Sequence, residues 1–253
     1  MRYVSWPVAD WVRDQLSAPY SGVTAIVPAG FEAYVRVFHP AESNHGGDPP
    51  LRWAAIAAGH GRVMHAGAQF HAIATPAGQR VVHDPNQLYG PVVRADGRPA
   101  VPPREVRARS YQPRMGSLPE AEFTAVVDVL SAFTATPRET VCCLWEGFGG
   151  MPGQKVGRID LPLRRYVVVQ GDLGAGGHRW WECAVSMHQL YQSPNLAWPV
   201  DRVWCVATEI DLLATLIGCS AAAAAALVAH PALEAWPIEP DASIGLHGDT
   251  ENV

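Results

Sequence analysis

Ionised side chains interrupt several of the most apolar segments of this chain, and these residues have the clearest potential for chemistry. Arg36 lies inside an apolar segment, whereas Glu146, Glu209 and Asp211 each follow one. A charge in or beside a buried strand must be paired, or it must line a cleft at the end of the strand. Two interpretations stay open: a structural ion pair between Arg36 and one of the three carboxylates, or a polar cluster that binds a ligand.

Several polar and aromatic residues accompany these charges at the predicted strand ends. Together they form our predicted binding site, for which no catalytic role can be assigned from the sequence. Its members are Tyr34, Arg36, His39, Glu146, Trp198, Asp201, Arg202, Glu209 and Asp211.

Histidine and glycine patterns do not identify a metal or nucleotide site. Six of the ten histidines fall between residues 39 and 83, but their spacing places no obvious pair on one face of a single element. The glycine-rich segment 146–155 lacks the Gly-Lys-Ser/Thr sequence of a phosphate-binding loop, because Gln154 separates Gly153 from Lys155. We therefore predict no metal and no cofactor.

The tryptophans are the most unusual feature of the composition. The chain has nine, and Trp180, Trp181 and Trp198 lie near glycine- or proline-rich stretches. Tryptophan in such places lines clefts and interfaces, although it also fills cores. Both interpretations remain open here.

Charge and cysteine content argue against a nucleic-acid-binding protein and against a disulfide-rich protein. The net charge of −5 argues against nucleic-acid binding, and an arginine stretch within 94–114 is better explained as a solvated loop. Five cysteines without a Cys-x-x-Cys spacing favour free, buried thiols in a reducing cytosol, with Cys142 and Cys143 inert. The start of the chain has no apolar region of a signal peptide, and the charge-free segment 212–229 fits a strand followed by a helix capped by Ser220 better than a membrane span. We expect a cytoplasmic protein with a protein or small-molecule partner; the oligomeric state stays open.

The periodicity predicts an α+β fold in which a mixed or antiparallel central sheet is covered by helices. Apolar runs predict strands over 31–38, 140–145, 166–170 and 202–210, the last of them central because both of its faces are apolar. An apolar stripe after residue 117 predicts the clearest helix, with Ser117 and Glu120 at capping-box spacing.

The same pattern predicts a domain organisation. We expect an α+β lobe over 1–93, a proline- and arginine-rich crossing over 94–119 and a second α+β lobe over 120–240 packed on the first. The polar tail 241–253 is expected to fray. The two lobes could also form one compact domain.

Three segments carry a resemblance to a known family. The runs 31–40, 144–149 and 198–211 resemble a bacterial protein family from GC-rich genomes that has no assigned activity, so the resemblance implies no catalytic residues. The sequence departs from the family pattern at Ala197, where tryptophan is expected, and at Cys219, where glycine is expected. A site shaped by those two positions would be altered in this chain.

Two functions follow as hypotheses. The first is a binding or interaction module that uses tryptophan-rich strand-end surfaces, with Arg36, Glu146 and Glu209 as polar anchors. The second is an enzyme of unknown class, for example a hydrolase, with a cleft lined by His39 and the same three residues. A concave site holding His39 beside a carboxylate would favour the enzyme, and an apolar patch of tryptophan would favour the module.

Overall fold

The computed structural model divides the chain into two units, which are described separately. Unit 1 comprises residues 1–39 and 115–241, and unit 2 comprises residues 40–114 and 242–253. The structure describes residues 2–3, 6–19, 21–44, 46–81, 92–98, 100, 111–148, 157–162, 164–172 and 191–252.

Unit 1 contains most of the regular structure. Its strands are β1 (Arg2–Tyr3), β2 (Ala33–Phe38), β7 (Thr140–Trp145), β8 (Arg158–Asp160), β9 (Arg165–Gly171), β10 (Leu196–Pro199), β11 (Cys205–Ala207), β12 (Ala214–Cys219) and β13 (Ala235–Pro237). Its helices are α1 (Asp10–Gln15), α4 (Glu120–Ser131) and α5 (Ala221–Ala229), with 3₁₀ turns at Trp6–Ala9, Val23–Ala25 and Glu146–Phe148.

The strands of unit 1 form one antiparallel sheet. Their order is β1-β9-β7-β10-β11-β12-β2-β13, and β8 also pairs with β9. Every pairing in this sheet is antiparallel. The predicted α+β class is therefore confirmed, with the antiparallel form of the sheet.

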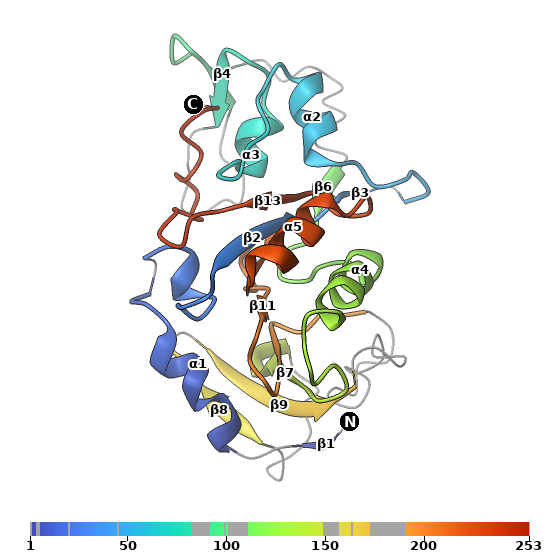
Figure 1. Ribbon diagram of the computed structural model, residues 1–253. Helices are drawn as coiled ribbons and strands as arrows, with labels where there is room; N and C mark the ends of the chain where they lie inside the picture. Colours follow the sequence, from blue (N-terminus) through green and yellow to red (C-terminus); the bar gives the residue numbers. More distant parts are fainter. Residues whose placement is uncertain are drawn as a thin grey trace. The chain divides into compact units, whose positions relative to one another are not determined.

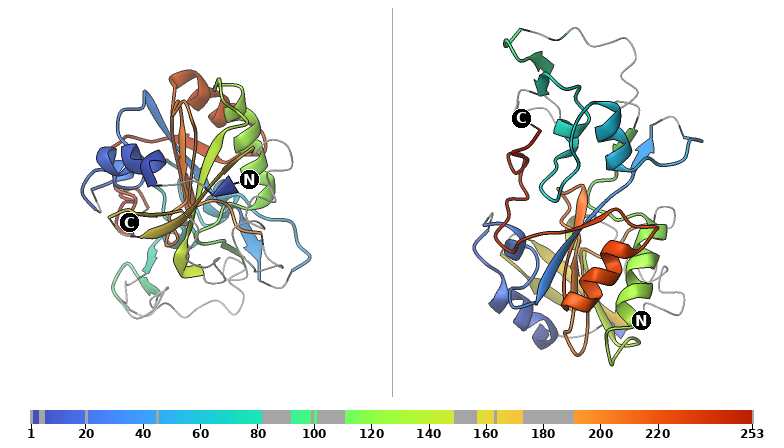
Figure 2. Two further views of the ribbon diagram at one scale, coloured as in Figure 1. Left: turned by 90° about the horizontal axis from the view of Figure 1, so that it is seen from below. Right: turned by 45° about the horizontal axis from the view of Figure 1, so that its top comes forward.

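The two faces of this sheet are covered by different helices (Figures 1 and 2). Helices α4 and α5 pack on one face, where Phe123, Val126 and Leu227 join Val35 and Ile217 in the core. Helix α1 lies on the other face. Successive residues of a strand point to opposite faces, and the central strands β11 and β12 are buried throughout, as expected for a sheet covered on both sides.

The local sequence explains the main elements of unit 1. Strand β7 has the predicted bounds, and β11 is central and buried, although it is shorter than the run 202–210. Helix α5 is capped as predicted, since the backbone N–H of Ala223 donates to Oγ of Ser220 at 3.2 Å. The capping box predicted for α4 is wrong: Pro119 occupies the N-cap, and Oγ of Ser117 accepts from the backbone N–H of Ser193.

Unit 2 is built from short elements. They are β3 (Ala41–Ser43), α2 (Trp53–Gly59), α3 (Phe70–Ile73), β4 (Gln79–Val81), β5 (Val92–Arg94) and β6 (Tyr111–Pro113). β3 pairs with β6 and β4 pairs with β5, both antiparallel.

The tail of the chain, predicted to be a polar segment that frays, is hydrogen-bonded into unit 2. The carboxylate of Asp249 is 2% exposed and accepts hydrogen bonds from the backbone N–H groups of Gln69 and Asn252. His65 donates to it through Nε2 at 2.9 Å, because Nδ1 of the same ring accepts from the N–H of Gly67. A short polar tail is therefore fixed by one buried carboxylate.

The observed units differ from the predicted lobes. Strand β2 belongs with the C-terminal half, because its partners are β12 and β13, and the tail belongs with residues 40–114. Segment 101–110 of the predicted crossing lies outside the described residues. The helices in the described ranges lack the length and apolar character that a membrane crossing requires.

Candidate functional site

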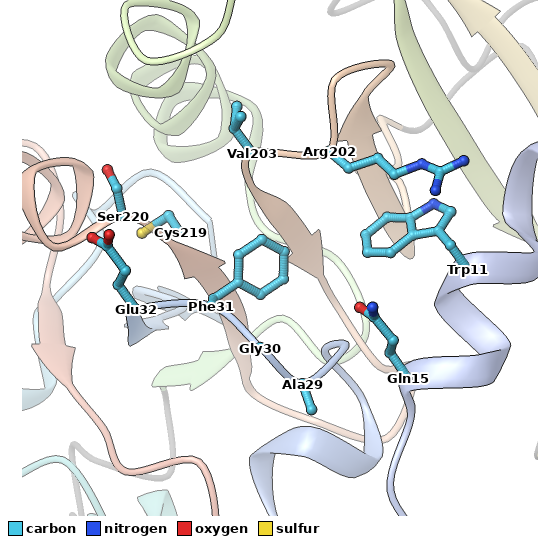
Figure 3. Close-up of a pocket in the computed structure, with 10 residues that line it drawn as sticks. All are labelled: Trp11, Gln15, Ala29, Gly30, Phe31, Glu32, Arg202, Val203, Cys219 and Ser220. Atoms are coloured by element: carbon cyan, nitrogen blue, oxygen red, sulfur yellow. The ribbon is translucent and has the colours of Figure 1, made fainter.

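Unit 1 contains a pocket of about 420 Å³ beside helix α1 (Figure 3). Four segments that lie far apart in the sequence meet there: α1, the loop before β2, the turn between β10 and β11, and the junction of β12 with α5. The lining residues are Trp11, Gln15, Ala29, Gly30, Phe31, Glu32, Arg202, Val203, Cys219 and Ser220.

Arg202 is held over Trp11 at one end of the pocket. Figure 3 shows the guanidinium beside the indole ring. Its central carbon lies 5.4 Å from the centroid of that ring. Such a contact contributes about 0.5–1 kcal/mol at an exposed site. Trp11 is itself backed by the buried Trp198, edge to face, with ring centroids 5.7 Å apart.

The backbone of Arg202 adopts a conformation that disfavours arginine. Its φ is +59°, and among the described residues it is the one non-glycine residue with positive φ. The left-handed region costs an L-residue about 1–2 kcal/mol. The backbone N–H of Arg202 donates to the carbonyl of Pro199 at 2.9 Å, so Arg202 is the last residue of a four-residue turn. In hairpins, a left-handed residue at this position is usually glycine or asparagine. The chain therefore places a long cation where the fold favours glycine.

Asp201 fixes this turn from the other side. Its Oδ2 accepts from the hydroxyl of Thr134 at 2.7 Å and from the N–H of Ala135 at 2.8 Å. The carboxylate next to Arg202 in the sequence is thus bound to the segment after α4. The guanidinium of Arg202 has no hydrogen-bond or ion-pair partner among the residues that the structure describes.

Phe31 forms the middle of the pocket, and two glycines place it there. A Cβ at Gly218 would overlap the ring of Phe31, so glycine in β12 allows the ring to lie against the strand. Gly30 has φ of +99°, which turns the chain into Phe31. Tyr34 holds the loop, because its hydroxyl donates to the carbonyl of Pro28 at 3.1 Å and accepts from the N–H of Phe31. Burial raises the pKa of the Tyr34 phenol, which keeps it a donor.

The opposite end of the pocket is acidic. Oε2 of Glu32 accepts from the backbone N–H of Ala221 at 3.0 Å, at the start of α5, beside the capping hydroxyl of Ser220. Cys219 lies next to it. Burial and the charge of Glu32 raise the pKa of the Cys219 thiol to about 12, so at neutral pH it is a thiol and a poor nucleophile.

One donor at the pocket has no acceptor. Nε1 of Trp11 is buried and lacks a hydrogen-bond partner among the described residues, and in Figure 3 it lies on the side of the ring nearest Arg202. A buried N–H without an acceptor costs about 1–3 kcal/mol. Together with the guanidinium, it gives this end of the pocket unused capacity to donate.

The predicted site residues fall into three places. Arg202 lines the pocket, while Tyr34, Asp201 and Trp198 position residues that line it. Trp198 is buried, so its predicted role at a surface is corrected to that of a support for Trp11.

The three predicted carboxylates lie together in a second place, an ion-pair cluster at one end of β7 and β9. Arg164 donates to Glu209 at 2.8 Å and to Asp211 at 2.6 Å. Glu146 binds Nε of Arg158 at 2.7 Å. The carboxylates expected to face Arg36 are thus bound by arginines of the β8–β9 edge.

Arg36 and His39 occupy the third place, the core of unit 1. The guanidinium of Arg36 lies 4.6 Å from the centroid of the Phe38 ring. Nε2 of His39 bonds the hydroxyl of Thr215 at 2.9 Å, and that hydroxyl bonds Thr208 at 2.8 Å. His39 is fully buried, which corrects its predicted place in an open cleft.

Sequence reasoning missed Trp11, Phe31 and Glu32 as lining residues. Strand 31–38 was predicted to begin at Phe31, whereas β2 begins at Ala33 and leaves Phe31 in the loop. The available clue was the sequence Pro-Ala-Gly-Phe at 28–31, in which a glycine directly precedes an aromatic residue. Trp180, Trp181, His45 and His83 lie outside the described residues.

The described residues contain no metal site and no reactive thiol among the predicted candidates. Among them, no group of three histidine, cysteine, aspartate or glutamate side chains could hold a metal ion. Cys142 and Cys143 are buried and free, and burial raises the pKa of both thiols, as predicted for inert residues.

Comparison of the chain with protein-family models, curated proteins and solved structures gives no match. The resemblance carried by segments 31–40, 144–149 and 198–211 therefore stays a prediction, and function must be argued from the pocket itself.

Proposed function

We propose that this chain is a binding module and that the pocket of unit 1 is its recognition site. The observation that carries this proposal is Arg202, which keeps a left-handed backbone and an exposed guanidinium over Trp11 at the pocket. Strained residues that a fold does not need gather at functional sites. An arginine in a turn that favours glycine is best explained by a contact that the guanidinium makes with a ligand.

The lining supports binding more than catalysis. It contains no histidine, and its thiol, Cys219, has a pKa raised to about 12 by burial and by Glu32. The hydroxyl of Ser220 already accepts from the backbone of α5. Concave shape, two aromatic rings and a few polar groups are the usual composition of a ligand pocket.

A fragment screen by ligand-observed NMR tests the proposal. Val203 lies at the edge of the pocket and is 41% exposed, so Val203→Trp places a large ring there and obstructs the pocket with little cost to folding. Val228 on α5 is 39% exposed and does not line the pocket, so Val228→Trp is the matched control. We expect a set of fragments that bind the wild type and Val228→Trp but not Val203→Trp.

Two results would oppose the proposal. If no fragment is sensitive to Val203→Trp while both variants remain folded, the pocket is not a recognition site. If bound fragments are instead chemically converted, the enzyme hypothesis replaces the module.

A further inference from the structure

We infer that the pocket takes a small aromatic monocarboxylate, with the carboxylate at Arg202 and the ring beside Phe31. This inference rests on the proposed function and assigns the ligand class of the same site. It depends on three features of the pocket: its donors, its rings and its single acidic end.

The donors at this end of the pocket have no acceptor among the described residues. Arg202 contacts the indole of Trp11, which leaves its five N–H groups available as a planar fork for a carboxylate. The adjacent Asp201 accepts from Thr134 and Ala135 through Oδ2, and no ion pair joins it to Arg202 among the described residues. The buried Nε1 of Trp11 adds a second donor without an acceptor.

The rings define the apolar part of the ligand. Phe31 is fixed between Gly218 and Tyr34, whose ring lies 6.2 Å away, edge to face. Figure 3 shows the Phe31 ring between Glu32 on one side and Trp11 on the other. Aromatic faces favour a flat aromatic group through offset or edge contacts.

The acidic end limits the ligand to one negative charge. Glu32 is fixed at the start of α5 and opposes a second anion there. A polyanion such as a nucleotide or nucleic acid therefore fits this pocket poorly.

Titration with matched probes tests the ligand class. We expect 3-phenylpropionate to bind the wild type about tenfold more tightly than 3-phenylpropanamide, because only the carboxylate forms charge-assisted bonds. The preference should disappear in Arg202→Gly, weaken in Arg202→Lys and fall with added salt. Acetate alone should bind far more weakly, because it lacks the ring.

A second charge on the probe tests the acidic end. We expect 3-(4-carboxyphenyl)propionate to bind several-fold more weakly than 3-phenylpropionate, and Glu32→Gln should remove that penalty while keeping an acceptor for Ala221.

The outcomes separate the two proposals. If the amide binds as tightly as the carboxylate and Val203→Trp abolishes both, the pocket binds ligands but the assigned class is wrong. If neither probe binds and no fragment in the screen depends on Val203, both proposals are wrong. A tenfold preference that survives in folded Arg202→Gly would also overturn the inference.

Discussion

Two substitutions of Arg202 separate the backbone strain from the side chain. Arg202→Gly and Arg202→Ala both remove the guanidinium, so they lose the same contact with Trp11. Alanine keeps the left-handed strain of about 1–2 kcal/mol, whereas glycine relieves it. Glycine loses about 0.5–1 kcal/mol more entropy on folding than alanine. We therefore expect Arg202→Gly to be more stable than Arg202→Ala by about 0.5–1 kcal/mol.

The sign of this difference is diagnostic, because alanine is normally the more stabilising of the two. The difference in the free energy of unfolding is measured by urea denaturation, with tryptophan fluorescence as the signal. The comparison requires that the two variants have the same m-value. Val200, in the same turn, has no positive φ and serves as the control position. There Val200→Ala should be more stable than Val200→Gly. If Arg202→Ala is instead more stable than Arg202→Gly by the usual amount of about 0.5–1 kcal/mol, Arg202 is unstrained and the reasoning for the binding site fails.

Three further predictions concern packing and charge. Gly218→Ala displaces the ring of Phe31 and should cost about 1–3 kcal/mol by urea denaturation, with most of that loss absent in a Phe31→Ala background. Asp249→Ala should free the tail, lowering hydrogen-exchange protection of residues 63–69 and destabilising unit 2 by about 1–3 kcal/mol at neutral pH. Arg164→Ala should cost about 1–3 kcal/mol, because it leaves Glu209, 13% exposed, without its cation. Arg165→Ala, at a pair 58% exposed on both sides, should cost clearly less, because solvent screens that pair.

The Asp249 prediction has a defined pH dependence. Burial raises the pKa of this carboxyl, but hydrogen bonds from Asn252, Gln69 and His65 outweigh it and the folded-state pKa is lowered. The stabilisation is therefore complete above the ordinary aspartate pKa of about 4 and is lost as pH falls through the lower folded value. A difference between wild type and Asp249→Ala that grows on acidification would contradict this account.

The other two predictions have equally clear contradictions. Unchanged stability of Gly218→Ala would mean that Phe31 moves freely and does not form a fixed wall. Equal losses for Arg164→Ala and Arg165→Ala would mean that the two ion pairs experience the same solvent screening.

The main elements of unit 1 were predictable because their sequences are locally unambiguous. β7 is a continuous apolar run, and the buried residues of α4 recur at helical spacing. Each of these patterns indicates one type of secondary structure. The pairing of β2 with β12 and β13 was not predictable, because side-chain periodicity carries no information about which distant strand becomes the neighbour.

The candidate site was only partly predictable for a related reason. Arg202 and Asp201 stood out as charges at the start of an apolar segment, and both belong to the turn beside the pocket. Trp11 and Phe31 could not be distinguished in the sequence from other apolar residues. The fold gives them their roles by placing Arg202 over Trp11 and Gly218 against Phe31. The partners of Glu209 and Glu146 were missed because Arg158 lies in β8 and Arg164 directly precedes β9, and the sequence does not reveal how these two strands pair.

The order of the strands has a consequence for how the chain reaches this structure. His39, just after β2, bonds a residue 176 positions later in the chain. During synthesis β2 leaves the ribosome long before β12 and β13 exist, and all of residues 40–114 follow before its neighbours appear. Unit 2 likewise waits for Asp249 to close it. Each unit must wait for segments that are synthesised long after its first elements, so folding should be slow and dependent on protection of the unpaired β2 edge.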